Sequence, residues 1–316
     1  MESEVRVEDR KSSVLTPSQL PCLRAVPSVN LASGCAHGCV YCYARSYSQF
    51  PGEGNVIVYG NTAAKLRREL QRKRRKPSHV YFSPSTDVFQ PVPRVLDMAY
   101  EMFEVLFAAG VGVAFVTKGR IPERHMALIA KNAERVRVQI GLVTTDEEVA
   151  HAIEPNAATP ALRLRQMDRL VQAGVPTRVR VAPILTGLTD DDATLADVFG
   201  ASAAAGVTQA ALNALHLRPA IVASLKRHLA PGRAEAILAR YRGAASLAVC
   251  WGKSSQTPLP AEARLELFAR AGSIALQYGI ETHVCGCMNP DLTNETCGLA
   301  GDWPDNSPIV EQLRLW

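Results

Sequence analysis

The sequence predicts an α/β fold in which the strands of a parallel sheet alternate with helices. Short apolar segments rich in β-branched residues recur along residues 26–212, and stretches of helical length separate them. Glycine follows several of these stretches, at Gly110, Gly174 and Gly206, as it does at many helix ends. Strands and helices that alternate in this way usually build a parallel sheet.

Six segments are the expected strands of this sheet. They are residues 26–32, 80–83, 112–117, 135–142, 177–184 and 207–212. The first cannot extend far backwards, because Pro27 has no N–H to donate to a sheet ladder. The helices expected between the strands are residues 63–75, 94–109, 123–132, 160–173 and 193–205.

The alternation ends near residue 215. Beyond it we expect helices at residues 218–229, 234–241 and 260–278, an apolar run at 247–251, a polar loop at 252–260 and a strand at 280–284. The chain is therefore divided into an N-terminal extension (residues 1–25), an α/β domain (26–215) and a C-terminal accessory region (216–316).

The composition indicates a globular protein. Of its 316 residues, 47% are hydrophobic and 21% charged, close to the average for globular domains, which excludes a disordered, collagen-like or coiled-coil chain. The net charge of +5 permits contact with phosphate without requiring it. No apolar run approaches the ~20 residues of a membrane helix, and the charged N-terminal segment lacks the apolar core of a secretion signal. We therefore expect a cytoplasmic protein with reduced thiols and no membrane partner.

Six of the eight cysteines lie in two short windows, so both windows are candidate sites. The first contains Cys35, Cys39 and Cys42, with glycines at 34 and 38 that suit a loop folding back around a ligand. Three thiolates on one loop can hold three irons of a [4Fe–4S] cube and leave the fourth iron open. Zinc is the alternative, although zinc sites usually pair two Cys-x2-Cys units, and His37 is poorly placed as a fourth ligand.

Five segments carry a resemblance to a known family: residues 34–45, 82–87, 115–119, 153–155 and 178–190. They resemble the radical S-adenosylmethionine (radical SAM) superfamily, and more closely its spore photoproduct lyase-like branch, sometimes labelled DNA repair photolyases. The cysteine loop is highly specific for the superfamily, whereas the other segments are individually weak but occur in the expected order. Together they run from about Asn30 to Asp190, just over half of the chain.

The resemblance implies a partial (βα)6 TIM-like barrel with its chemistry at the carboxyl ends of the strands. It implies that Cys35, Cys39 and Cys42 bind the cluster and that S-adenosylmethionine binds the open iron. An electron from a flavodoxin- or ferredoxin-like donor then cleaves the cofactor to methionine and a 5′-deoxyadenosyl radical. That radical abstracts hydrogen from a substrate that the sequence does not identify.

The resemblance also suggests roles for two tyrosines. Tyr43 follows the third cysteine, where the superfamily usually places an aromatic beside the adenine; a core aromatic is the alternative. Tyr41 aligns with a tyrosine that the lyase uses in radical relay, and a simple packing residue fits the pattern at least as well.

Polar residues after the second and third strands are the expected cofactor-binding groups. Ser83, Ser85, Thr86 and Asp87 form a turn that in the family touches the methionine moiety, mostly through the last two. The alternative for Asp87 is capping of the next helix. Lys118 matches a family lysine that pairs with the cofactor carboxylate, whereas a lone lysine at a strand end is more often solvated.

Arg178 and Arg180 alternate with valine along the fifth strand, so both point to the same face of the sheet. Contact of one of them with the site and an ion pair with Glu154 are equally compatible with this pattern.

One departure from the lyase bears on the substrate. In spore photoproduct lyase, a cysteine in the segment matching residues 82–87 returns a hydrogen atom to the repaired thymine, and no cysteine stands there in this chain. No aromatic and basic platform for flipped bases is evident near the C-terminus. The basic run at residues 67–76 more often forms a solvated helix face than a phosphate-binding surface. Nucleic acid is therefore not the favoured partner.

The second window contains Cys285, Cys287 and Cys297. An auxiliary iron–sulfur cluster, a zinc site and buried thiols without metal are its three interpretations, and the fourth ligand would be Cys250, His283, Cys22 or the substrate. Overall we expect a radical SAM enzyme. The alternatives are a DNA lesion lyase of the spore photoproduct type and a non-catalytic protein that binds through iron–sulfur or zinc.

Overall fold

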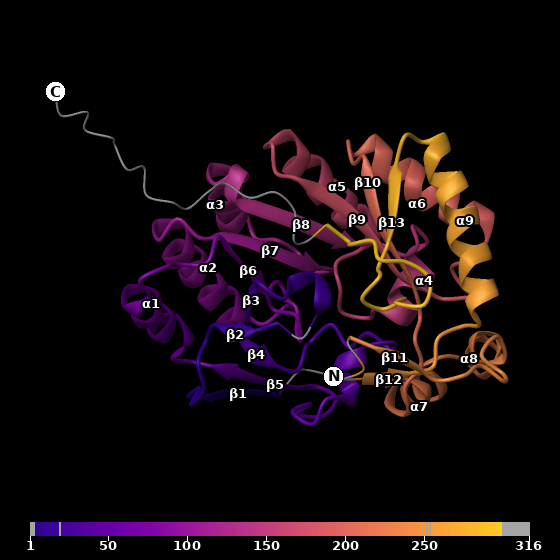
Figure 1. Cartoon of the computed structure of the whole chain (residues 1–316), viewed down its shortest axis with the longest axis horizontal. Helices are drawn as coiled ribbons and strands as arrows, with labels where there is room; N and C mark the ends of the chain where they lie inside the picture. The colour runs from indigo at the N-terminus through magenta and orange to yellow at the C-terminus, as the bar shows by residue number, and fades with distance from the viewer. Residues whose placement is uncertain (1–3, 19, 251, 253, 299–316) are drawn as a thin grey trace.

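The computed structural model describes residues 4–18, 20–250, 252 and 254–298. Its centre is an eight-stranded sheet of order β13-β10-β9-β8-β7-β6-β3-β2 (Figure 1). In that order the strands are Glu281–Val284, Gln209–Ala214, Thr177–Ile184, Val136–Gly141, Gly112–Thr117, His79–Phe82, Pro27–Val29 and Thr16–Pro17. Every neighbouring pair is parallel except β2 with β3. The predicted α/β fold with a mostly parallel sheet is therefore confirmed, and within the described residues the sheet stays open rather than closing into a barrel.

The first expected strand is not continuous. Residues 26–32 form β3 and then β4 (Ala32–Ser33), and β4 belongs to a second sheet of order β1-β5-β4 with Glu4–Glu8 (β1) and Asn55–Tyr59 (β5). The break falls at Asn30, whose side-chain oxygen accepts hydrogen bonds from the Ser85 N–H (3.1 Å) and hydroxyl (2.7 Å). The chain thus leaves the main sheet beside the end of β6, and this exit positions the loop that follows.

Nine helices flank the sheets within the described part of the chain. They are Thr62–Arg72 (α1), Pro93–Ala108 (α2), Glu123–Lys131 (α3), Glu147–Ile153 (α4), Pro160–Gln172 (α5), Asp192–Ala204 (α6), Pro219–His228 (α7), Pro231–Ala239 (α8) and Ala261–Gln277 (α9). Eight correspond to expected helices with ends shifted by a few residues. The exception, α4, is too short to show a helical period in the sequence; it begins where the Asp146 carboxylate accepts the Val149 N–H at 3.0 Å.

The two faces of the main sheet bury different kinds of side chain. Because side chains alternate along a strand, Phe115 of β7 packs beneath α2, against Phe103, while its neighbour Ala114 points to the opposite face. We call that opposite face the inner face; it also carries Tyr81 of β6 and Ala211 of β10. A second, separate apolar cluster covers it.

The segment after residue 215 contributes to the main sheet as well as packing on it. The expected strand at residues 280–284 is β13, which pairs in parallel with β10, and α9 packs against α6. The expected polar loop at 252–260 is wrong in part, because Ser254–Gln256 (β12) pairs antiparallel with Leu247–Val249 (β11). None of the helices described here is long and apolar enough to cross a bilayer.

Candidate functional site

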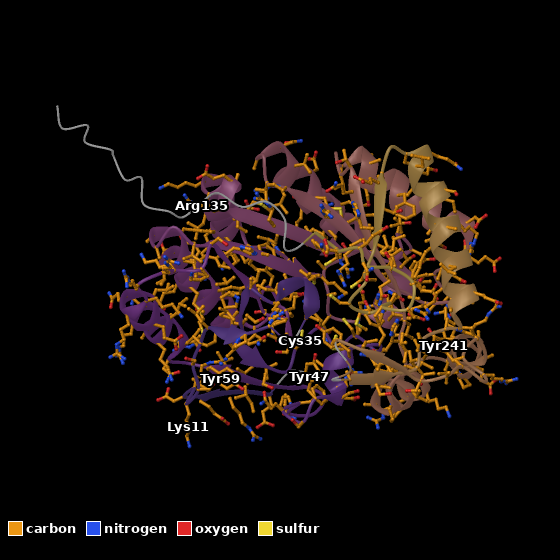
Figure 2. The ribbon with its side chains drawn as sticks, in the orientation of Figure 1. Lys11, Cys35, Tyr47, Tyr59, Arg135 and Tyr241 are labelled. Atoms are coloured by element: carbon orange, nitrogen blue, oxygen red, sulfur yellow. The ribbon has the colours of Figure 1, made fainter. Side chains whose placement is uncertain are left out.

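The first cysteine loop leaves the end of β4 and runs into a short 3-10 helix, Tyr43–Ser46. Figure 2 shows Cys35 near the middle of the molecule, beside the carboxyl ends of the central strands. Gly34 permits the sharp return of the chain, since its φ is +81° and a Cβ there would lie 2.2 Å from the carbonyl oxygen of Asn55. The loop is therefore folded back against β5 at a position that only glycine can occupy.

The segment that follows α4 holds the loop from one side. The Val40 N–H donates to the Ile153 carbonyl at 3.0 Å, and the Asn156 side-chain amide donates to the Ala36 carbonyl at 3.0 Å. His37 Nδ1 lies 3.0 Å from the Asn156 carbonyl oxygen. The conspicuous sequence at residues 153–155 thus marks an anchor of the cysteine loop, which its sequence alone did not indicate.

Asp87 holds the loop from the other side. Its carboxylate accepts hydrogen bonds from the Thr117 hydroxyl (2.7 Å) and the Lys118 N–H (2.8 Å), and it lies 3.2 Å from His37 Nε2. Burial by itself would raise the pKa of Asp87, but His37 and the hydrogen-bond donors outweigh it and hold that pKa well below its usual value. The alternative of helix capping is wrong, because α2 begins at Pro93 with Val92 as its N-cap.

The remaining polar residues of that turn also contact protein. The Thr86 hydroxyl donates to the Gly34 carbonyl at 2.6 Å, and the Ser85 hydroxyl is bound to Asn30. Ser83 differs: its backbone is left-handed (φ +55°), its hydroxyl is buried, and no partner for it exists among the described residues. Of the expected cofactor-binding turn, Ser83 is therefore the member with an unused hydroxyl.

Gln90 is a loop anchor that sequence reasoning missed. Its side-chain oxygen accepts the Ala36 N–H at 2.9 Å, its amide donates to the Thr86 hydroxyl at 2.7 Å, and it is fully buried. The signal that could have identified Gln90 is its polar amide within the otherwise apolar run at residues 88–92.

Lys118 lies beside the loop and is half-buried rather than solvated. Its ammonium group is 5.8 Å from the centre of the Tyr41 ring. Burial disfavours its charge, but Cys39, Glu154 and Asp87 together outweigh burial and raise the pKa of Lys118. The side chain is thus a stable cation next to the second cysteine.

Tyr41 is tied into a buried ion pair. Its hydroxyl donates to the Glu154 carboxylate, which pairs with Arg163 of α5 at 2.5 Å, and both partners are almost wholly buried. Burial and Glu154 raise the pKa of Tyr41 well above its ordinary value, so the phenol stays protonated. The alternative of an ion pair between Glu154 and Arg178 or Arg180 is therefore wrong. Arg163 was missed, although it stands in helical register with the buried Met167 and Leu170.

Tyr43 is not the core aromatic that was the alternative for it. Its side chain is 47% exposed, its hydroxyl donates to the Pro84 carbonyl, and its ring meets that of Tyr47 edge to face at 5.8 Å. An exposed aromatic face therefore stands directly after the third cysteine.

The three thiols suit a multinuclear cluster better than a single ion. Burial and then Asp87 raise the pKa of Cys35 to about 12, and burial raises that of Cys39 as well, so both thiols need a bound cation in order to ionise. Across the described residues, no three His, Cys, Asp or Glu side chains are grouped as ligands of one ion. In a [4Fe–4S] cube each thiolate binds a different iron, so such convergence is not required.

Comparison with known proteins agrees with this geometry. The family model described as "Radical SAM superfamily" matches residues 29–198. The uncharacterized protein Rv2578c of Mycobacterium tuberculosis (strain ATCC 25618 / H37Rv) is 32% identical over 237 residues, which cover 71% of this chain and 69% of that protein. The uncharacterized protein ORF301 of Acidianus two-tailed virus is 27% identical over 168 residues, 50% of this chain and 55% of that protein.

Among solved structures, spore photoproduct lyase has a similar fold. A mutant of that enzyme with bound AdoMet and dinucleoside spore photoproduct superposes with a TM-score of 0.68 at 15% identity, covering 88% of this chain and 81% of the other. At that identity the likeness concerns the fold alone.

Proposed function

As the chain belongs to the radical SAM superfamily, we propose that it is an enzyme that cleaves S-adenosylmethionine reductively to methionine and a 5′-deoxyadenosyl radical, which takes hydrogen from a substrate. A [4Fe–4S] cluster bound by Cys35, Cys39 and Cys42 would supply the electron. The observation that carries this proposal is the fixed cysteine loop, which is hydrogen-bonded to Thr86 and Gln90 after β6 and to Asn156 after α4.

Two groups beside the loop are suited to bind the amino-acid part of the cofactor. Lys118 supplies a cation for its carboxylate, and the unpartnered Ser83 hydroxyl supplies a hydrogen bond. Ser85, Thr86 and Asp87 act as positioning residues instead, because their polar atoms already hold the chain. Tyr43 offers its exposed ring to the adenine.

For Tyr41, the structure favours a positioning role over the radical relay that the resemblance suggests. Its hydroxyl is already bound to Glu154, and Glu154 is bound to Arg163, so it serves first to hold the loop against α5. A relay of hydrogen through this phenol would require that hydroxyl to leave Glu154.

The partners follow from this chemistry. A one-electron donor of the ferredoxin or flavodoxin type would reduce the cluster, and thiols that must stay reduced favour a cytoplasmic location. Repair of a DNA lesion, as in spore photoproduct lyase, is the second candidate, favoured by the shared fold. Against it, Arg67, Arg68 and Arg72 of α1 are exposed, and α1 lies at the edge of the molecule, away from Cys35 (Figures 1 and 2).

Anaerobic reconstitution tests the proposal. Protein loaded with iron and sulfide is mixed with dithionite and S-adenosylmethionine, and 5′-deoxyadenosine is measured. Single Cys35→Ala, Cys39→Ala and Cys42→Ala variants should lose the product and the iron of this cluster, about four irons per chain, whereas Cys250→Ser should keep both. An intact cluster without product would support a non-catalytic binding protein. Tight DNA binding that weakens steeply with salt would support the lesion lyase.

A further inference from the structure

Four cysteine thiols from two distant parts of the chain meet above the inner face of the sheet. The Cys22 N–H donates to Cys287 Sγ at 3.5 Å, and Cys22 packs against the inner-face cluster that contains Cys297. Cys285 and Cys287 belong to one turn, and both are buried, as is Cys297. Cys22 lies in the N-terminal 3-10 helix Pro21–Leu23, more than 260 positions before its partners in the sequence.

Two glycines beside these cysteines are packed so closely that a side chain would clash with their neighbours. At Gly286, between Cys285 and Cys287, a Cβ would lie 2.7 Å from the Glu295 carbonyl oxygen. At Gly298, after Cys297, it would lie 2.1 Å from Arg178 Nη1. The Gly286 N–H donates to that same Glu295 carbonyl at 3.1 Å, so the two cysteine-bearing segments are hydrogen-bonded face to face.

Asn289 links the turn of Cys285 and Cys287 to the core of the fold. Asn289 donates to the Cys285 carbonyl at 2.9 Å and to Asn213 of β10 at 2.8 Å, and its side-chain oxygen accepts from the buried Arg264 of α9 at 2.9 Å. Arg264 also pairs with Asp291. Two elements of the core are thus used to fix one cysteine turn.

One N–H donor and one cation lie beside the cysteine sulfurs. The Cys22 N–H points to Cys287 Sγ at 3.5 Å, and N–H donors of this kind stabilise metal-bound thiolates. Arg180, on the inner face and bonded to Gln139 at 2.9 Å, interacts electrostatically with Cys285 and Cys297. Its charge offsets the negative charge that several thiolates would bring together.

We propose that Cys22, Cys285, Cys287 and Cys297 form a second metal site, with Cys22 as the fourth thiolate. Four sulfur donors without nitrogen or oxygen ligands select an iron–sulfur cluster or Zn²⁺. The cluster is favoured because no three such side chains are grouped around one ion in the described part of the chain, and in a cluster each thiolate binds its own iron.

The other candidates for the fourth ligand lie in different contacts. Cys250 directs its N–H (3.3 Å) and its thiol (3.9 Å) to the carbonyl oxygen of Cys287, not to a sulfur. His283 faces Glu281 at 3.6 Å. Cys250 is therefore a matched control, because it is a neighbouring cysteine that does not belong to the proposed site.

Metal content per chain tests the site, and it does so independently of the proposed catalytic function. The starting variant carries Cys35→Ala, Cys39→Ala and Cys42→Ala, which removes the first cluster. After anaerobic reconstitution with iron and sulfide, or with zinc, it should retain about four irons and four sulfides, or one zinc. Adding Cys22→Ser should lower the metal per chain at least several-fold, whereas adding Cys250→Ser should leave it unchanged.

Either metal would support the site, and the ratio of iron to zinc identifies the occupant. The same site should also be visible in the unmutated chain as about eight irons, or about four irons with one zinc, which covers the case that the triple variant does not fold. No metal beyond the first cluster would overturn the proposal. So would disulfides among these four cysteines in protein purified without oxygen, or equal metal loss from Cys22→Ser and Cys250→Ser.

Discussion

The Glu154–Arg163 pair provides the sharpest test of how the cysteine loop is held. Arg163→Leu removes the paired cation and leaves the Glu154 carboxylate buried, with a direct hydrogen bond from Tyr41 and the Lys118 charge further away. An uncompensated buried charge of this kind costs about 3–5 kcal/mol. The substitution also takes hydrogen bonds from the carbonyls of Ala158 (2.7 Å) and Gly141 (2.9 Å), so the loss should fall in the upper half of that range.

Urea denaturation of the reduced protein measures the loss, and the same helix provides its control. Arg169 of α5 pairs with Glu123 through two hydrogen bonds, but the two side chains are 46% and 74% exposed. Arg169→Leu should therefore change the free energy of unfolding far less, because water replaces the lost partner. The double variant Arg163→Leu/Glu154→Leu should recover part of the loss, since no unpaired charge remains.

Two results would refute this reasoning. One is an equal effect of Arg163→Leu and Arg169→Leu on stability. The other is a double variant that loses the full sum of the two single losses. Iron content should fall together with stability in Arg163→Leu. The reason is that Ile153 and Asn156, which bind the cysteine loop, stand on either side of Glu154, the C-cap of α4.

Three further substitutions address the loop and its neighbours. Gly34→Ala should prevent assembly of the first cluster, measured as a loss of about four irons per chain. Gly54→Ala (φ +74°, nothing within 4 Å of its Cβ) should cost only about 1–2 kcal/mol and keep that cluster. Gln90→Leu leaves the buried Ala36 N–H unpaired, so it should cost about 1–3 kcal/mol in urea denaturation and reduce iron content; unchanged values would remove Gln90 from the anchor. Lys118→Met should weaken S-adenosylmethionine binding in equilibrium titration with iron content unchanged; full affinity would exclude a contact with the cofactor carboxylate.

The sequence predicted those parts of the fold that local patterns encode. The strands β7, β8 and β9 are rich in β-branched residues, and a glycine follows α2, α5 and α6, so these elements were found within a few residues. The division of residues 26–32 between two sheets was not predictable, because Asn30 leaves the first sheet through bonds to Ser85, 55 positions later. β1 and β5 were missed because they belong to a second sheet outside the α/β alternation and pair only across the fold, with Glu4 beside Asn55.

The candidate site was likewise predictable where local sequence encodes it, and not where it depends on contacts between distant residues. Cysteine spacing identified the loop, and a resemblance identified the polar turn and Lys118. Which member of the turn keeps an unused group depends on distances in three dimensions: Thr86 and Asp87 were the favoured cofactor contacts, yet they hold the chain, and the unpartnered hydroxyl belongs to Ser83. Cys22 carried no local signal at all, since it stands alone in the sequence and meets its partners only in the fold.

The Asp87 carboxylate connects the end of β7 to the cysteine loop. One oxygen binds the Thr117 hydroxyl and the other binds the Lys118 N–H and faces His37, so the end of β7 and the cysteine loop are fixed relative to a single group. Lys118 therefore cannot shift relative to the loop without breaking a buried, charge-assisted hydrogen bond. A cofactor that bridges the loop and Lys118 would then bind to groups already set at their final separation, which lowers the ordering cost of binding.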